Sequence, residues 1–152
     1  MLRWTETMAV GVGELDAQHM RLITIYNKLG NILLSAARRD AKLEIVMELA
    51  DYSLEHFKAE ETLMEQAKFE GLEAHKKEHL SFKLTILDYH KRVGTNDPLA
   101  APQLLNFLHK WIRKHICEVD ALYAPALSGG GGDEGNDGDG GGDAAAAEQP
   151  QG

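Results

Sequence analysis

The chain has 152 residues, a formal net charge of −8 and 43% hydrophobic residues, the size and composition of about one domain. All 16 lysines and arginines lie in residues 1–127 together with 18 of the 24 acidic residues, so the part expected to fold is nearly neutral. Since it shows neither a basic face nor an apolar run of about 18 residues, we expect no nucleic-acid partner and no membrane span.

Residues 1–14 contain apolar side chains and two glycines in no helical pattern, which predicts an arm lying across the fold. They also lack a continuous apolar segment and a cleavage site, so we expect no secretory signal. The chain has one cysteine, Cys117, and no internal disulfide can form. These features favour a reduced, cytoplasmic setting, and we expect a monomer.

Four stretches show the apolar spacing of three and four residues that predicts amphipathic helices. They run from Asp16, a predicted N-cap, to about Arg38, from the polar break at 38–40 to about Ala67, from Leu72 to Val93, and from Pro98 or Pro102 to just before Pro125. Short connections make successive helices antiparallel. The pattern therefore predicts an all-α, antiparallel up-down-up-down four-helix bundle.

The composition changes abruptly at residue 128. Residues 128–152 are rich in glycine and aspartate and contain no aromatic or branched apolar side chain. Such a segment cannot bury enough surface to offset its chain entropy. We therefore expect residues 1–127 to form the bundle domain and residues 128–152 to be a disordered tail.

Each predicted helix has polar residues on its apolar stripe, namely His19 on the first, His56 and Glu60 on the second, His75 and His79 on the third, and His115 on the fourth. A single such histidine is more simply explained as a hydrogen-bonded core residue, and an isolated pair as a solvated surface pair. In an antiparallel bundle, however, all of them fall at the same end. Since each unpaired buried polar group costs about 1–3 kcal/mol, the combination predicts a two-metal site.

Spacing alone leaves the second carboxylate of this site open. Glu118 lies three residues after His115 and would be the simple choice. Asp120 lies five residues after His115, about 140° round an ideal helix. A local widening of the helix to a π-type turn, or a frayed helix end, would bring Asp120 inward.

The segments VGVGELDAQH, HFKAEE, HKKEH and HICEVD, with Trp4 ahead of them, resemble the haemerythrin family, specifically the single-domain bacterial haemerythrins, over about residues 4–125. The resemblance selects Asp120 over Glu118, because the last motif of the family has an aspartate five residues after its histidine. It implies a di-iron centre with an oxo or hydroxo bridge, in which one iron takes His75, His79 and His115, the other takes His19 and His56, and Glu60 and Asp120 bridge the two.

The resemblance further implies a non-haem di-iron protein that binds O2 reversibly for carriage, storage or delivery, and that is not an enzyme. Five imidazoles and two carboxylates agree with this, because di-iron sites of the ferritin-like class use about four carboxylates and two histidines. Two alternatives stay open: an O2 or redox sensor read by a partner protein, and an enzyme that reduces peroxide or nitric oxide. An electron donor or an O2-accepting protein could be a partner.

Overall fold

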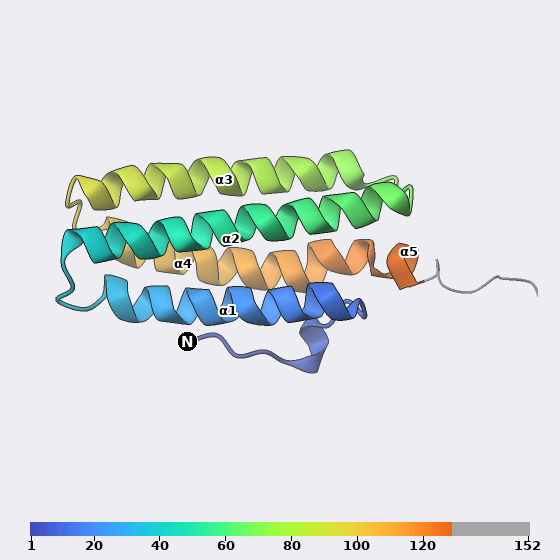
Figure 1. Ribbon diagram of the computed structural model, residues 1–152, viewed down its shortest axis with the longest axis horizontal. Coiled ribbons are helices and arrows are strands. Elements are labelled where there is room, and N and C mark those ends of the chain that lie inside the picture. The colour runs from blue at the N-terminus through green and yellow to red at the C-terminus, as the bar shows by residue number, and fades with distance from the viewer. Residues whose placement is uncertain (129–152) are drawn as a thin grey trace, which may run out of the picture.

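The computed structural model describes residues 1–128, which form an antiparallel four-helix bundle (Figure 1). Its main helices are α1 (Gly13–Leu33), α2 (Arg39–Gln66), α3 (Leu72–Gly94) and α4 (Ala100–Lys114). After α4 the chain continues through a π-helix, η2 (His115–Val119), a 3-10 turn, η3 (Asp120–Leu122), and the short α5 (Ala124–Ser128). The predicted all-α architecture is confirmed; beyond Ser128, the expected tail lies outside the described residues.

The N-terminal arm is attached to α1 by polar contacts. The backbone N–H of Leu2 donates to Oδ1 of Asn27, and the Asn27 amide donates to the Leu2 carbonyl oxygen, both at 2.9 Å. Farther along the arm, the Asp16 carboxylate accepts the N–H groups of Val10 at 2.7 Å and Gly11 at 3.2 Å. The predicted arm is thus confirmed, and its packing brings Val10 into the bundle end.

Two predicted helix ends were wrong. Asp16 is not the N-cap of α1, because the helix starts at Gly13 with Val12 in the capping position. The carboxylate of Asp16 instead satisfies the arm, a long-range role that helix-start patterns do not describe. At the other end, α1 stops at Leu33 rather than near Arg38.

The bundle contains two apolar clusters of unequal size. The larger includes the end away from the N-terminus of α1. Its side chains that are at most 3% exposed include Leu29, Leu33, Ile45, Leu49, Ile86, Leu104 and Leu108. The smaller closes the opposite end and consists of Val10, Leu15, Met64 and Tyr123. Within residues 1–128, no helix is both long and apolar enough to cross a membrane.

Candidate metal centre

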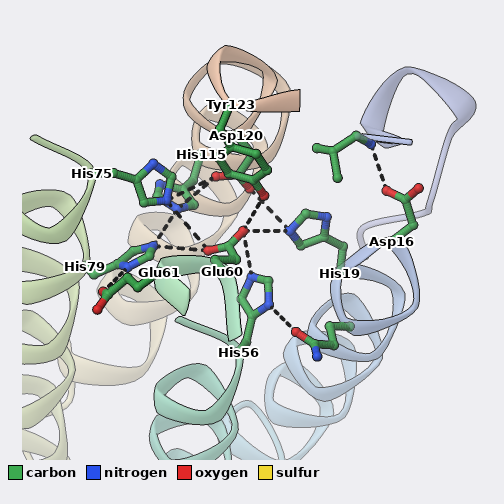
Figure 2. A network of polar contacts seen from close by, with 12 residues as sticks. Asp16, His19, His56, Glu60, Glu61, His75, His79, His115, Asp120 and Tyr123 are labelled. Carbon is green, nitrogen blue, oxygen red and sulfur yellow. Dashed lines mark hydrogen bonds and ion pairs between the residues drawn. The ribbon is translucent and has the colours of Figure 1, made fainter. Parts of the chain in front are cut away.

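All seven residues predicted for the site meet near the end of the bundle where α1 and α3 begin and α2 ends (Figure 2). Each is at most 3% exposed. The pairs His56/Glu60 and His75/His79 are four residues apart on regular helix, so that both members of a pair face the same way. His19 comes from α1, and His115 and Asp120 come from η2 and η3, which continue the chain after α4, so the four predicted helical segments all contribute.

The π-helix η2 brings Asp120 to the site. The backbone N–H of Asp120 donates to the carbonyl oxygen of His115, five residues back, instead of the four of an α-helix. The widened turn keeps His115 and Asp120 on the same side of the chain, and both are buried, whereas Glu118 is exposed. The π-type turn considered from the sequence is present, and Asp120, not Glu118, is the buried carboxylate of this turn.

The histidines fall into two groups that share Glu60. Potential ligand atoms of His75, His79, His115 and Glu60 all lie within 4.8 Å of one another, and the same holds for His19, His56 and Glu60. The closest nitrogens, Nε2 of His79 and Nε2 of His115, are only 3.1 Å apart. We call these the three-histidine group and the two-histidine group.

The carboxylate of Glu60 lies between the groups, and each of its oxygens faces one of them. Oε1 is 3.4 Å from Nε2 of both His19 and His56. Oε2 is 3.2 Å from Nε2 of His79 and 3.6 Å from Nε2 of His75. This is the disposition that a carboxylate needs to serve two cations at once.

Asp120 belongs to neither compact set, yet its oxygens divide in the same way. Oδ2 is 3.2 Å from Nε2 of His19, in the two-histidine group. Oδ1 is 3.2 Å from Nε2 of His115 and 3.6 Å from Nε2 of His75, in the three-histidine group. Two carboxylates therefore span the same pair of histidine groups.

The cluster residues fit metal ions, because several of their buried polar atoms have no hydrogen-bond partner in the protein. Seven buried side-chain atoms of the described residues have no hydrogen-bond partner: His19 Nδ1 and Nε2, Glu60 Oε2, His75 Nε2, His115 Nδ1, and Asp120 Oδ1 and Oδ2. Each would cost about 1–3 kcal/mol if left so. Five of the seven are atoms directed at the other members of the cluster. Cations among them would satisfy these atoms.

The electrostatics of the cluster show the same need for positive charge. Burial raises the pKa of Asp120, and repulsion from Glu60 adds to this, bringing it to about 7. Burial would lower the pKa of His19, but its contacts with the carboxylates of Asp120 and Glu60 outweigh this effect and raise the pKa to about 9. Both shifts favour the protonated forms of Asp120 and His19 in the metal-free protein. A metal ion bound beside the two carboxylates would displace these protons.

Glu60, His56 and His115 are held in the forms that bind metals. Burial opposes ionisation of Glu60, but electrostatic attraction to His56 and close contacts with the neighbouring histidines hold its pKa well below the usual range. Burial lowers the pKa of His56 to about 4 and that of His115 well below its ordinary value. A carboxylate and neutral imidazoles are the protonation states required of ligands.

Aromatic rings cover the three-histidine group on its inner side. Phe57 stacks on His79 with ring centroids 3.8 Å apart and a 9° interplanar angle. Trp111 stacks on His115 at 4.1 Å and 15°. Cys117 is exposed, as expected of a residue on the outer side of helix α4 and its π-helical continuation.

Three further side chains contact the cluster, and the sequence analysis did not identify them. Oε1 of Gln18 is 2.9 Å from Nδ1 of His56, and Oε1 of Glu61 is 2.7 Å from Nδ1 of His79. The hydroxyl of Tyr123 donates to Oε1 of Glu60 at 2.6 Å. Burial raises the pKa of Tyr123, and the nearby carboxylates raise it further, so the phenol keeps its proton. Gln18 and Glu61 are sequence neighbours of predicted ligands, which was the available signal for these two, whereas Tyr123 lies three residues after Asp120.

Comparison with known proteins agrees with this geometry. The sequence profile described as "Hemerythrin HHE cation binding domain" matches residues 10–127. The chain is 33% identical to a bacteriohemerythrin of Pseudomonas aeruginosa, covering 83% of this chain and 81% of the relative. It is 30% identical to that of Methylococcus capsulatus, covering 84% and 98%.

Solved structures agree as well. A crystal structure of wild-type hemerythrin superposes with a TM-score of 0.77 at 30% identity, and covers 84% of this chain and 98% of that one. The matched range, residues 10–127, contains all seven residues of the cluster. The resemblance predicted from the histidine motifs is confirmed: the chain belongs to the haemerythrin family.

Proposed function

We propose that this protein holds two iron ions and binds O2 reversibly, for carriage, storage or delivery. In this proposal one iron takes His75, His79 and His115, the other takes His19 and His56, and Glu60 and Asp120 bridge them. The observation that supports it most strongly is the division of both carboxylates, each with one oxygen toward either histidine group.

The composition of the cluster favours reversible binding. When bound, the iron pair would supply two electrons for O2 and recover them on release. Five neutral imidazoles add no negative charge, so the site stabilises higher oxidation states less than a carboxylate-rich site does. Phe57 and Trp111 cover imidazole faces and keep water away from His79 and His115. Reversible binding needs no side chain as a general acid or base, so we propose no enzymatic role.

Two measurements test the proposal. Aerobically purified protein should show the charge-transfer absorption of an oxo-bridged diferric pair. Stopped-flow mixing of the diferrous protein with O2 should then give an adduct that disappears when O2 is removed. Rapid, irreversible oxidation would contradict carriage and favour a sensor, whereas turnover with peroxide or nitric oxide would favour an enzyme.

We also propose that residues 1–127 form the complete metal-binding domain and that the protein acts as a monomer in the cytoplasm. The exposed thiol of Cys117 suits a reducing compartment. A chain ending at residue 127 should keep the iron content of the full chain. A lower iron content would show that the segment after residue 127 contributes to the domain.

A further inference from the structure

The hydrogen bonds that surround the cluster differ between its two histidine groups. In the three-histidine group, Nδ1 of His79 contacts the carboxylate of Glu61 at 2.7 Å. In the two-histidine group, Nδ1 of His56 contacts the neutral side-chain amide of Gln18 at 2.9 Å. In both cases Nε2 faces the cluster, so Nδ1 bears the hydrogen and donates it outward.

The partner of Nδ1 changes the strength of Nε2 as a ligand. An imidazole that donates to a carboxylate gains electron density and becomes a more basic ligand than one that donates to an uncharged amide. Glu61 therefore strengthens His79, while Gln18 gives His56 orientation with little added basicity. This contrast adds to the difference that three histidines against two already create.

Tyr123 acts in the same direction through the shared carboxylate. Its hydroxyl donates to Oε1 of Glu60, the oxygen that faces His19 and His56. A hydrogen bond at that oxygen draws negative charge from it, leaving Oε2 as the freer donor toward the three-histidine group. Tyr123 is completely buried, so water does not compete for this contact.

We infer that Gln18, Glu61 and Tyr123 are positioning residues that make the two metal positions unequal, so that the three-histidine group loads first and the two-histidine group binds the more exchangeable ion. The inference rests on the proposed function, since it requires metal ions at both groups. It adds that the contacts of Gln18, Glu61 and Tyr123, and not only the number of histidines, determine how much the two metal affinities differ.

The test is a titration of the metal-free full chain with Co²⁺. Calorimetry and the visible absorption of bound Co²⁺ measure the affinity of each binding step during the titration. The wild type should bind two ions in two separate steps. Glu61→Gln should weaken the tighter step about 10- to 100-fold, because outer-partner substitutions have effects of that size. Gln18→Glu should tighten the weaker step by a similar factor, and Tyr123→Phe should tighten it several-fold.

Matched controls are available for each substitution. Glu65→Gln changes an exposed carboxylate one turn farther along α2, Gln66→Glu an exposed amide at the end of α2, and Tyr26→Phe a phenol of the large apolar cluster. All three should leave both binding steps within about twofold of the wild type. Far-UV circular dichroism should show that every variant keeps its helix content.

The outcomes separate the inference from the proposed function. Two binding steps in the wild type that stay unchanged in Gln18→Glu, Glu61→Gln and Tyr123→Phe would overturn the inference and leave the metal site intact. A wild type that binds no Co²⁺ and no Fe²⁺ would overturn the proposed function itself. Because the three residues lie in different elements, misfolding of one variant leaves the other two to decide.

Discussion

The two ends of the bundle are built on opposite principles. The end filled by Leu29, Leu49, Leu104 and Leu108 is apolar and completely buried, so its contacts stabilise the fold without any bound ion. The other end buries five histidines and two carboxylates, several with no protein partner. One end thus supplies the stability that the other requires, and the polar end approaches full satisfaction only when cations are bound.

Removal of both irons should cause the largest loss of stability, because the ions bind at the polar end. A ligand present at 1,000 times its dissociation constant stabilises a fold by about 4 kcal/mol, so two ions would contribute about 8 kcal/mol. Thermal unfolding of the iron-loaded and metal-free chains measures the difference. Equal melting temperatures would show that the polar end does not depend on metal.

Substitution of single ligands should remove one or both irons, with a corresponding loss of stability. Glu60→Ala should release both irons, because Glu60 faces both histidine groups, whereas His19→Ala should leave about one iron per chain. The corresponding losses of stability are about 8 and 4 kcal/mol under the same metal excess. Iron counting on the purified variants decides, and equal losses from the two variants would contradict the bridging role.

The cost in stability of a substitution in the apolar end should not depend on bound iron. Leu108→Ala should lower the free energy of unfolding by about 2–5 kcal/mol, because its side chain is completely buried. The change should be the same with and without metal. Denaturant unfolding of both forms measures it, with Leu122→Ala, at an exposed leucine, as the control. A cost that appears only in the metal-free form would mean that the two ends are coupled.

The smallest effect is expected at the arm. Asp16→Ala removes the acceptor of the Val10 and Gly11 N–H groups and should cost about 1–2 kcal/mol. Iron content should not change, since Asp16 contacts none of the seven cluster residues in the described hydrogen bonds and ion pairs. Denaturant unfolding and iron counting test both parts. A loss of iron would show that the arm helps to close the site.

The sequence predicted the apolar end and most of the polar end because both follow regular helix geometry. His56/Glu60 and His75/His79 obey the four-residue spacing, and their common level follows from antiparallel packing. Asp120 does not obey it, and only the family resemblance selected it. The π-helix depends on backbone hydrogen bonding at one turn, which apolar periodicity does not encode.

The same irregular turn determines which residues face inward after it. Leu122 lies seven residues after His115, a spacing that puts two side chains on the same face of a regular helix, yet it is 68% exposed, and Tyr123 occupies the interior instead. The widened turn shifts the inward face of the chain after Val119 by one residue. Gln18 and Glu61 were missed for another reason: their contacts depend on side-chain conformation and on the imidazole tautomer, neither of which spacing reveals.

The π-helix should also affect the rate at which this part of the bundle opens. A π-turn is a rare interruption of the α-helical hydrogen-bond pattern, and this one leads into the last turns of the bundle, so we expect it to open more often than α4 before it. One opening would withdraw His115 and Asp120 together, a histidine from one metal and a carboxylate shared by both. We therefore expect amide hydrogen exchange at residues 116–120 and the rate of iron loss to share a single opening step.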